Sequence, residues 1–159
     1  MHRRILFFAI VGSLATVLVG QRVYAQVHSD HPLIKGVTDA KVTLQQGLTV
    51  AAREGRPISA KFEVEDGKLQ LSVYTAKDGK FSEVIIDHTT GKVAKTDAIV
   101  EGEDLAEAKS ENATMGKAKT DLKAAVDKSV AAASGSRAIS VSQLTMVSDE
   151  ASLMAIRRE

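Results

Sequence analysis

The pattern of hydrophobic and polar positions changes in the first half of the chain from a helical period to a period of two. Apolar residues first recur at helical spacing, at Val42, Leu44, Leu48, Ala51 and Ala52. Thr43 and Gln46 have the spacing of a capping box, in which each side chain accepts a hydrogen bond from the other residue's backbone N–H. Gly55 and Pro57 then favour a helix end. The pattern predicts a helix over residues 43–54.

An alternation of apolar and polar residues follows this helix. It begins with Ala60, Phe62 and Val64 between Lys61, Glu63 and Glu65, and continues through Leu69, Leu71 and Val73. Asp66-Gly67 and Asp78-Gly79 are hairpin signals, because glycine readily takes the positive φ of a tight turn. Residues 81–86 predict a third strand, and a short fourth strand is expected near Val93. Consecutive turns predict an antiparallel meander, and the preceding helix is the nearest cover for its apolar face.

The second half of the chain predicts a long helix followed by a short β segment. Its helical stripe is rich in alanine and holds Leu105, Ala108, Met115, Ala118, Leu122, Ala125, Val126, Val130 and Ala133. Gly116 lies inside the stripe and is a place where the helix could divide. Residues 137–147 predict a strand whose phase slips at Gln143, and residues 148–150 and 153–156 predict a turn and a last strand. From Leu122 onward the expected order is helix, strand, turn and strand. Residues 44–73 have the same order, so an internal repeat is an open alternative.

The start of the chain has the features of an export signal. A basic beginning at residues 2–4 precedes the apolar residues 5–19, and Val23-Tyr24-Ala25 offers small residues for a cleavage site. We expect residues 1–25 to be a signal peptide cleaved after Ala25, which places the mature protein in the periplasm or outside the cell. An uncleaved N-terminal anchor is the alternative. Residues 26–40 are polar, contain Pro and Gly, and predict a flexible tether.

Charge and composition narrow the classes of partner. The chain has 21 basic and 20 acidic residues, and the signal segment would remove three arginines and no acid. A near-neutral mature chain gives no electrostatic reason to bind nucleic acid or an anionic membrane. The absence of cysteine excludes disulfides and thiol catalysis. A single core stabilised by burial alone is expected.

A specific motif closes the predicted meander. An apolar run ends in Asp87, and a short polar loop with Thr90, Gly91 and Lys92 leads back to Val93. Asp87 can accept backbone N–H bonds across the loop, and Gly91 can supply a positive φ, so we assign these residues a structural role in the turn.

Residues 44–93 resemble the PepSY domain. The resemblance rests on the helix with Leu44, Leu48, Ala51 and Ala52, on residues 60–64, on the Asp78-Gly79 turn before Phe81, and on the closing motif at residues 84–93. It implies an α+β fold with one helix packed on an antiparallel β-meander, here over residues 41–98. Residues 99–159 would hold the later helix and short strands, with an incomplete second copy as an alternative. PepSY domains occur in propeptides of secreted metallopeptidases, so the resemblance implies a binding or peptidase-restraining module.

Evidence for catalysis or a cofactor is weak in the sequence. No His-Glu-x-x-His, Gly-x-Ser-x-Gly or phosphate-binding glycine loop is present. A different possibility is a metal site at the mature N-terminus, where the amine of Gln26, the amide nitrogens of Val27 and His28 and the His28 imidazole could form a square-planar Cu(II) or Ni(II) site. Cyclisation of the N-terminal glutamine would remove the amine.

The sequence therefore predicts a non-catalytic exported module without a cofactor that binds a protein or peptide of the cell envelope. An extended peptide could add to a sheet edge, and residues 60–65 or the strand near Val93 are the candidate edges. Metal or small-ligand handling in the envelope is the alternative function.

Overall fold

The computed structural model describes residues 31–143 and 151–157, which form an α+β fold within the compact unit Pro32–Glu159. Its helices are α2 (Pro32–Asp39), α3 (Leu44–Ala51), α4 (Gly102–Met115) and α5 (Leu122–Ala132). Its strands are β1 (Arg56–Glu65), β2 (Lys68–Lys77), β3 (Lys80–Ile86), β4 (Val93–Ile99), β5 (Ser136–Gln143) and β6 (Ala151–Arg157). The predicted combination of helices and an antiparallel sheet is confirmed.

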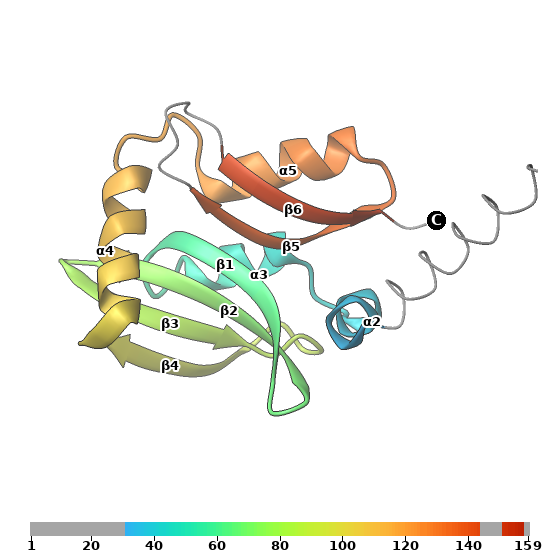
Figure 1. The fold of residues 1–159 in the computed structure, drawn as a ribbon, viewed down its shortest axis with the longest axis horizontal. Helices are drawn as coiled ribbons and strands as arrows, with labels where there is room; N and C mark the ends of the chain where they lie inside the picture. Colours follow the sequence, from blue (N-terminus) through green and yellow to red (C-terminus); the bar gives the residue numbers. More distant parts are fainter. Residues whose placement is uncertain (1–30, 144–150, 158–159) are drawn as a thin grey trace, which may run out of the picture. The chain divides into compact units, whose positions relative to one another are not determined.

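The six strands form one sheet in the order β4-β3-β2-β1-β5-β6, and every neighbouring pair is antiparallel (Figure 1). Asp66 and Gly67 join β1 to β2 with φ values of 49° and 74°, and Asp78 and Gly79 join β2 to β3 with φ values of 51° and 73°. Two successive residues with positive φ are the signature of a type I′ turn. Both predicted hairpins and the four-strand meander are therefore confirmed.

Helix α3 begins as the sequence predicts. The side chain of Thr43 accepts a hydrogen bond from the backbone N–H of Gln46, and the side chain of Gln46 accepts one from the backbone N–H of Thr43, which completes the capping box. Gly47 allows close packing on the sheet, because a Cβ added there would lie 2.6 Å from Cδ2 of Leu71 on β2. The helix therefore covers the apolar face of the meander, as expected.

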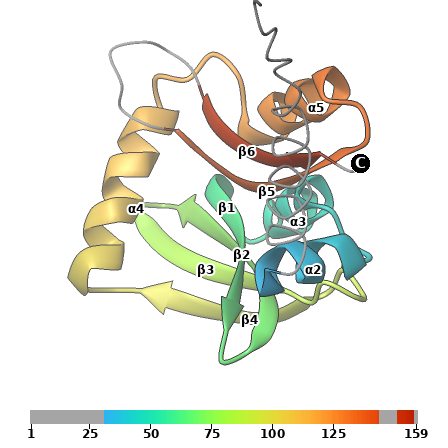
Figure 2. The same ribbon diagram turned by 45° about the vertical axis from the view of Figure 1, so that its right-hand side comes forward.

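The two faces of the sheet have different compositions. Ala60 on β1 pairs with Val73 on β2, and both are buried on the face that α3 covers. Their neighbours Lys61 and Tyr74 point to the other face, which α4 covers in part. Figure 2 separates α4 on one side of the sheet from α2, α3 and α5 on the other. The main core is thus on the α3 face, and the α4 face is polar.

One prediction about the helices is wrong, and the structure decides that the long helix divides at Gly116, the place that the sequence indicated. The expected tether at residues 26–40 contains helix α2, whose Val37 is fully buried, so this part of the chain is ordered by packing on the sheet. The expected long helix is divided into α4 and α5. Gly116 is the C-cap of α4, and Asp121 starts α5 by accepting a hydrogen bond from the backbone N–H of Ala124.

The last two strands extend the sheet beyond β1. β5 pairs with β1 at residues 59–61, and β6 pairs with β5, so the order helix, strand, strand occurs in α3–β1–β2 and again in α5–β5–β6. The ladder irregularity in β5 lies between Ala138 and Ser140, and not at Gln143 where the sequence pattern slips. The predicted turn at residues 148–150 and the signal segment 1–25 lie outside the described residues. Among the described helices, none is long and apolar enough to span a membrane.

Candidate functional site

The closing motif forms a hydrogen-bonded loop between β3 and β4. Oδ1 of Asp87 accepts from the backbone N–H groups of Thr89 and Thr90, both at 2.8 Å. The backbone N–H of Gly91 donates to the carbonyl oxygen of Asp87, and Gly91 has a φ of 72°. The N–H bonds from Thr90 and Thr89 lower the pKa of Asp87, because they favour its charged form. The contacts of Asp87, Thr90 and Gly91 are thus within the loop itself.

The remaining residues of the loop contribute further backbone contacts. The backbone N–H of Lys92 lies 3.4 Å from Oγ1 of Thr90, and its carbonyl oxygen accepts from the backbone N–H of Asp87. The carbonyl oxygen of His88 accepts from the backbone N–H groups of Lys41 and Val42, just before α3. The loop therefore also connects the end of β3 to the entrance of α3.

The proposed N-terminal metal ligands Gln26, Val27 and His28 lie outside the described residues. Within residues 31–143, no group of three or more His, Asp or Glu side chains is placed to hold a metal ion. The structure therefore adds nothing to the copper or nickel hypothesis.

One of the two candidate edges is an edge in the structure. Among the described strands, β4 is the first of the sheet and pairs only with β3, whereas β1 pairs with β2 and with β5. The expectation that residues 60–65 form an edge strand is therefore wrong at residues 60 and 61, which pair with β5, whereas no ladder pair with β5 is described for residues 62–65. The sequence could not reveal this, because the strand that covers β1 follows it by about seventy residues.

The backbone groups that β4 presents at this edge follow from the hairpin geometry. Lys77 and Lys80 flank a two-residue turn and so form a hydrogen-bonded pair. Along β3 the backbone N–H and C=O groups point alternately to the two neighbouring strands, so those of residues 82, 84 and 86 point toward β2, as those of Lys80 do. The backbone groups of Glu83 therefore point toward its partner Asp97 on β4. The intervening residues of β4, Thr96 and Ala98, therefore direct their N–H and C=O groups toward the open side.

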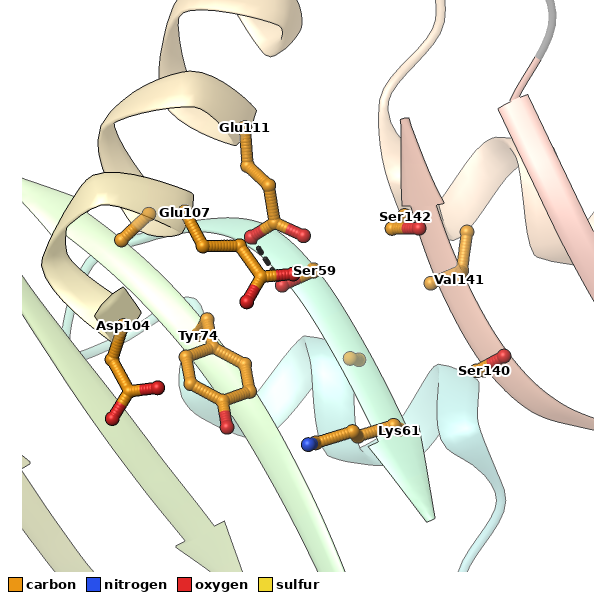
Figure 3. A pocket seen from close by; sticks show the side chains of 11 residues that line it. Ser59, Lys61, Tyr74, Asp104, Glu107, Glu111, Ser140, Val141 and Ser142 are labelled. Carbon is orange, nitrogen blue, oxygen red and sulfur yellow. Dashed lines mark hydrogen bonds between the residues drawn. The ribbon is translucent and has the colours of Figure 1, made fainter. Parts of the chain in front are cut away.

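A cavity of about 180 Å³ lies between α4 and the polar face of the sheet (Figure 3). Acidic side chains at successive helical turns line it from α4, at Asp104, Glu107 and Glu111. The opposite wall carries hydroxyl, ammonium and phenol groups from three strands, at Ser59, Lys61, Tyr74, Ser140 and Ser142. Figure 3 shows Glu107 and Glu111 directed from α4 toward β1. The cavity therefore has an acidic wall on the helix and a wall of polar side chains on the sheet.

Two adjacent contacts fix α4 against the sheet at this cavity. Oγ of Ser59 donates a hydrogen bond of 2.6 Å to Oε2 of Glu111. At the next residue of α4, the side-chain oxygen of Asn112 accepts a hydrogen bond from the guanidinium of Arg56. Burial raises the pKa of Glu111, although the Ser59 hydrogen bond acts in the opposite direction. Glu107 raises it further, because two nearby negative charges repel each other.

Lys61, the basic side chain of the cavity, already has partners for its positive charge. Nζ of Lys61 lies 2.9 Å from Oε2 of Glu63 and 5.6 Å from the ring centroid of Tyr74. Burial lowers the pKa of Lys61, but Glu63 and Tyr74 outweigh it and the net direction is upward. Burial and the charge of Glu83 raise the pKa of Tyr74 to about 12.

These protonation states decide what chemistry the cavity can support. Lys61 stays protonated, so it cannot serve Ser59 as a general base, and Tyr74 stays neutral at ordinary pH. The other polar groups of the lining are three carboxylates, which carry negative charge, and three serine hydroxyls, and all six can accept hydrogen bonds. The arrangement is suited to binding a donor-rich, positively charged group.

The sequence pattern gives only a partial signal of this site. The spacing of Asp104, Glu107 and Glu111 places them on one helix face, and Ala108 lies between them on the same face. Acidic residues on the same helix face as a small apolar residue indicate that this face packs against a polar surface. The pattern could not reveal the partner wall, because Ser59, Tyr74 and Ser140 come from strands that only the folded sheet brings together.

Comparison of the chain with known protein families, curated proteins and solved structures gave no significant match.

Proposed function

We propose that this chain is a non-catalytic, exported PepSY-like module that binds an extended segment of an envelope protein or peptide at the edge of strand β4. The observation that carries the proposal is the open backbone of β4 at one end of the six-stranded sheet. An edge strand can accept another extended segment through main-chain hydrogen bonds. The groups available for this purpose belong to Thr96 and Ala98.

The surroundings of β4 support this choice of surface. Large hydrophobic residues are exposed at both ends of the strand, with exposed fractions of 39% at Val93 and 73% at Val100. Such residues offer apolar contacts to the side chains of an added strand. Between them, Lys95 and Asp97 form an ion pair of 2.7 Å on the side of the strand that bears Glu83. A partner segment with apolar residues at its two ends and polar residues between them fits this pattern.

Two further features support the PepSY-like and non-catalytic parts of the proposal. The helix, the meander and the closing Asp87–Gly91 loop occur in the order that the resemblance implies. In the cavity at α4, Lys61 stays protonated and Tyr74 stays neutral, so neither of these two side chains can act as a base for Ser59. A restraining or scaffolding role needs only a binding surface, which the edge supplies.

The experiment is site-specific photo-crosslinking of the exported full chain in the envelope. A benzophenone amino acid at position 98 should capture a partner, and peptide mapping of the adduct should place the crosslink in an extended segment. Thr96→Pro should abolish capture, because proline removes an N–H group that faces the open edge and leaves the β3 ladder intact.

Thr96→Ala is the matched control, because it removes the same side chain but keeps the backbone N–H. It should retain capture, and both variants should keep the melting temperature within a few degrees. Capture that survives Thr96→Pro, or that is equal from a probe at the exposed Ala131 on α5, would refute binding at the β4 edge.

A further inference from the structure

We propose that the cavity between α4 and the strands β1, β2 and β5 binds the side chain of an arginine residue in a peptide. This inference rests on the proposed function, because the arginine belongs to the bound protein or peptide. It concerns a site on the face of the sheet, separate from the β4 edge: the cavity is lined by residues of β1, β2 and β5, and β4 contributes none of them.

The charge of the cavity favours a cation. Asp104, Glu107 and Glu111 all contribute to its lining, and none of them has an ion-pair partner among the described residues. Lys61 pairs with Glu63 at 2.9 Å and its charge also acts on Glu111, but one ammonium cannot balance the three carboxylates of the cavity. A cation bound beside Glu107 and Glu111 would remove the repulsion between these two carboxylates.

The hydrogen-bonding groups favour a guanidinium over a simple ammonium. Glu107 and Glu111 line the cavity on one side, and the hydroxyls of Ser140 and Ser142 line it on the other (Figure 3). A guanidinium has five N–H donors in a fixed plane and can bond to acceptors on two sides at once, whereas an ammonium has three donors around one atom. Charge-assisted bonds of this kind are the stronger class.

The size and shape of the cavity fit a single side chain. Its volume of about 180 Å³ is too small for a folded element and large enough for one long side chain. Part of the wall is held before binding, because Ser59 is only 8% exposed and bonds to Glu111, and Arg56 bonds to Asn112 at the next position of α4. A preformed cavity avoids much of the ordering cost of binding.

The test uses capped amino acids that carry the side chain without a peptide strand. N-acetyl-arginine N-methylamide is titrated into the isotopically labelled full chain, and backbone amide shifts are recorded by NMR. N-acetyl-citrulline N-methylamide is the neutral control of nearly equal shape. We expect the arginine probe to shift the amides of Ser59, Lys61 and Ser140, and the citrulline probe to bind at least about tenfold more weakly.

Variants identify the carboxylates responsible. Glu107→Gln combined with Glu111→Gln should weaken binding of the arginine probe about tenfold or more, because two charged acceptors become neutral. Glu103→Gln is the matched control, since Glu103 is exposed on the same helix and does not line the cavity. It should bind the arginine probe as the unmodified chain does.

Three results would overturn the inference. They are equal binding of the arginine and citrulline probes, unchanged binding in the Glu107/Glu111 double variant, and binding of spermidine at the cavity without binding of the arginine probe. Crosslinking at position 98 does not depend on these probes. Failure here with successful crosslinking refutes the arginine site alone, whereas loss of crosslinking with a positive titration refutes the β4 edge.

Discussion

Ser59 on β1 donates a 2.6 Å hydrogen bond to Glu111 on α4, and this contact joins residues 52 positions apart in the chain. It fixes the helix against the polar face of the sheet. It also keeps a carboxylate in a partly buried place, where burial raises its pKa. The same pair therefore links the position of α4 to the stability of the fold and to the charge of the cavity.

The first prediction concerns the pH dependence that Glu111 creates. Its pKa in the folded protein is above the ordinary value of 4.5, so the folded state holds the proton more tightly than the unfolded state. Stability is therefore lost as pH rises from 4.5 through the folded pKa. Glu111→Gln should remove this loss, so its free energy of unfolding should exceed that of the unmodified chain increasingly as pH rises toward 7.

Urea unfolding between pH 4.5 and 7 measures the difference. Glu103→Gln is the control for a change of charge on an exposed part of α4 and should follow the unmodified chain. A constant difference between Glu111→Gln and the unmodified chain across this range would contradict the prediction.

The second prediction concerns Asp87, whose pKa is shifted in the opposite direction. The N–H groups of Thr90 and Thr89 lower its pKa below 3.8, so its stabilising effect is present above 3.8 and is lost as pH falls through the folded pKa. Asp87→Asn keeps an oxygen acceptor but cannot be charged. It should be less stable than the unmodified chain at pH 6, and the difference should shrink below pH 3.8.

Thermal unfolding at several pH values checks this prediction. Asp78→Asn is the comparison, because Asp78 lies in an exposed turn whose φ of 51° asparagine also tolerates. A difference for Asp87→Asn that grows as pH falls would show that the loop does not stabilise the charged carboxylate.

The third prediction concerns the close packing of α3 on β2. Gly47→Val would place new atoms against the fully buried Leu71, whose Cδ2 lies 2.6 Å from the position of an added Cβ. Overpacking of this kind typically costs about 1–3 kcal/mol. Denaturant unfolding should show a loss in that range. Gly116→Ala, at the C-cap of α4, has φ of −64° and should be neutral or slightly stabilising.

The fourth prediction concerns Arg137 on β5. Its guanidinium donates to the carbonyl oxygens of Ala40 and Val42, both at 2.8 Å, and so ties β5 to the connection between α2 and α3. Hydrogen bonds to charged groups contribute about 1.5–3 kcal/mol. Arg137→Gln should lower the free energy of unfolding by about 2 kcal/mol, measured in urea. Arg53→Gln, on an exposed residue after α3, should change it by less than about 0.5 kcal/mol.

The local elements were predictable because their causes are local. The capping box of Thr43 and Gln46 and the two Asp-Gly turns depend on residues within four positions of one another. Helix α2 was missed for the opposite reason. Leu33, Ile34 and Val37 recur at helical spacing, but Pro32 and Gly36 locally favour a loop, and the packing of the fully buried Val37 decides for the helix.

By itself, the sequence determined the meander, its turns, helix α3 and the class of fold, because alternation, capping and glycine turns act over short distances. Only the tertiary structure decided that β1 is an interior strand, that β4 is an edge, and that α4 lies over Ser59 and Tyr74. These facts depend on pairing and packing between residues about fifty to eighty positions apart. Such pairing is set by the whole core and not by the residues around any one position.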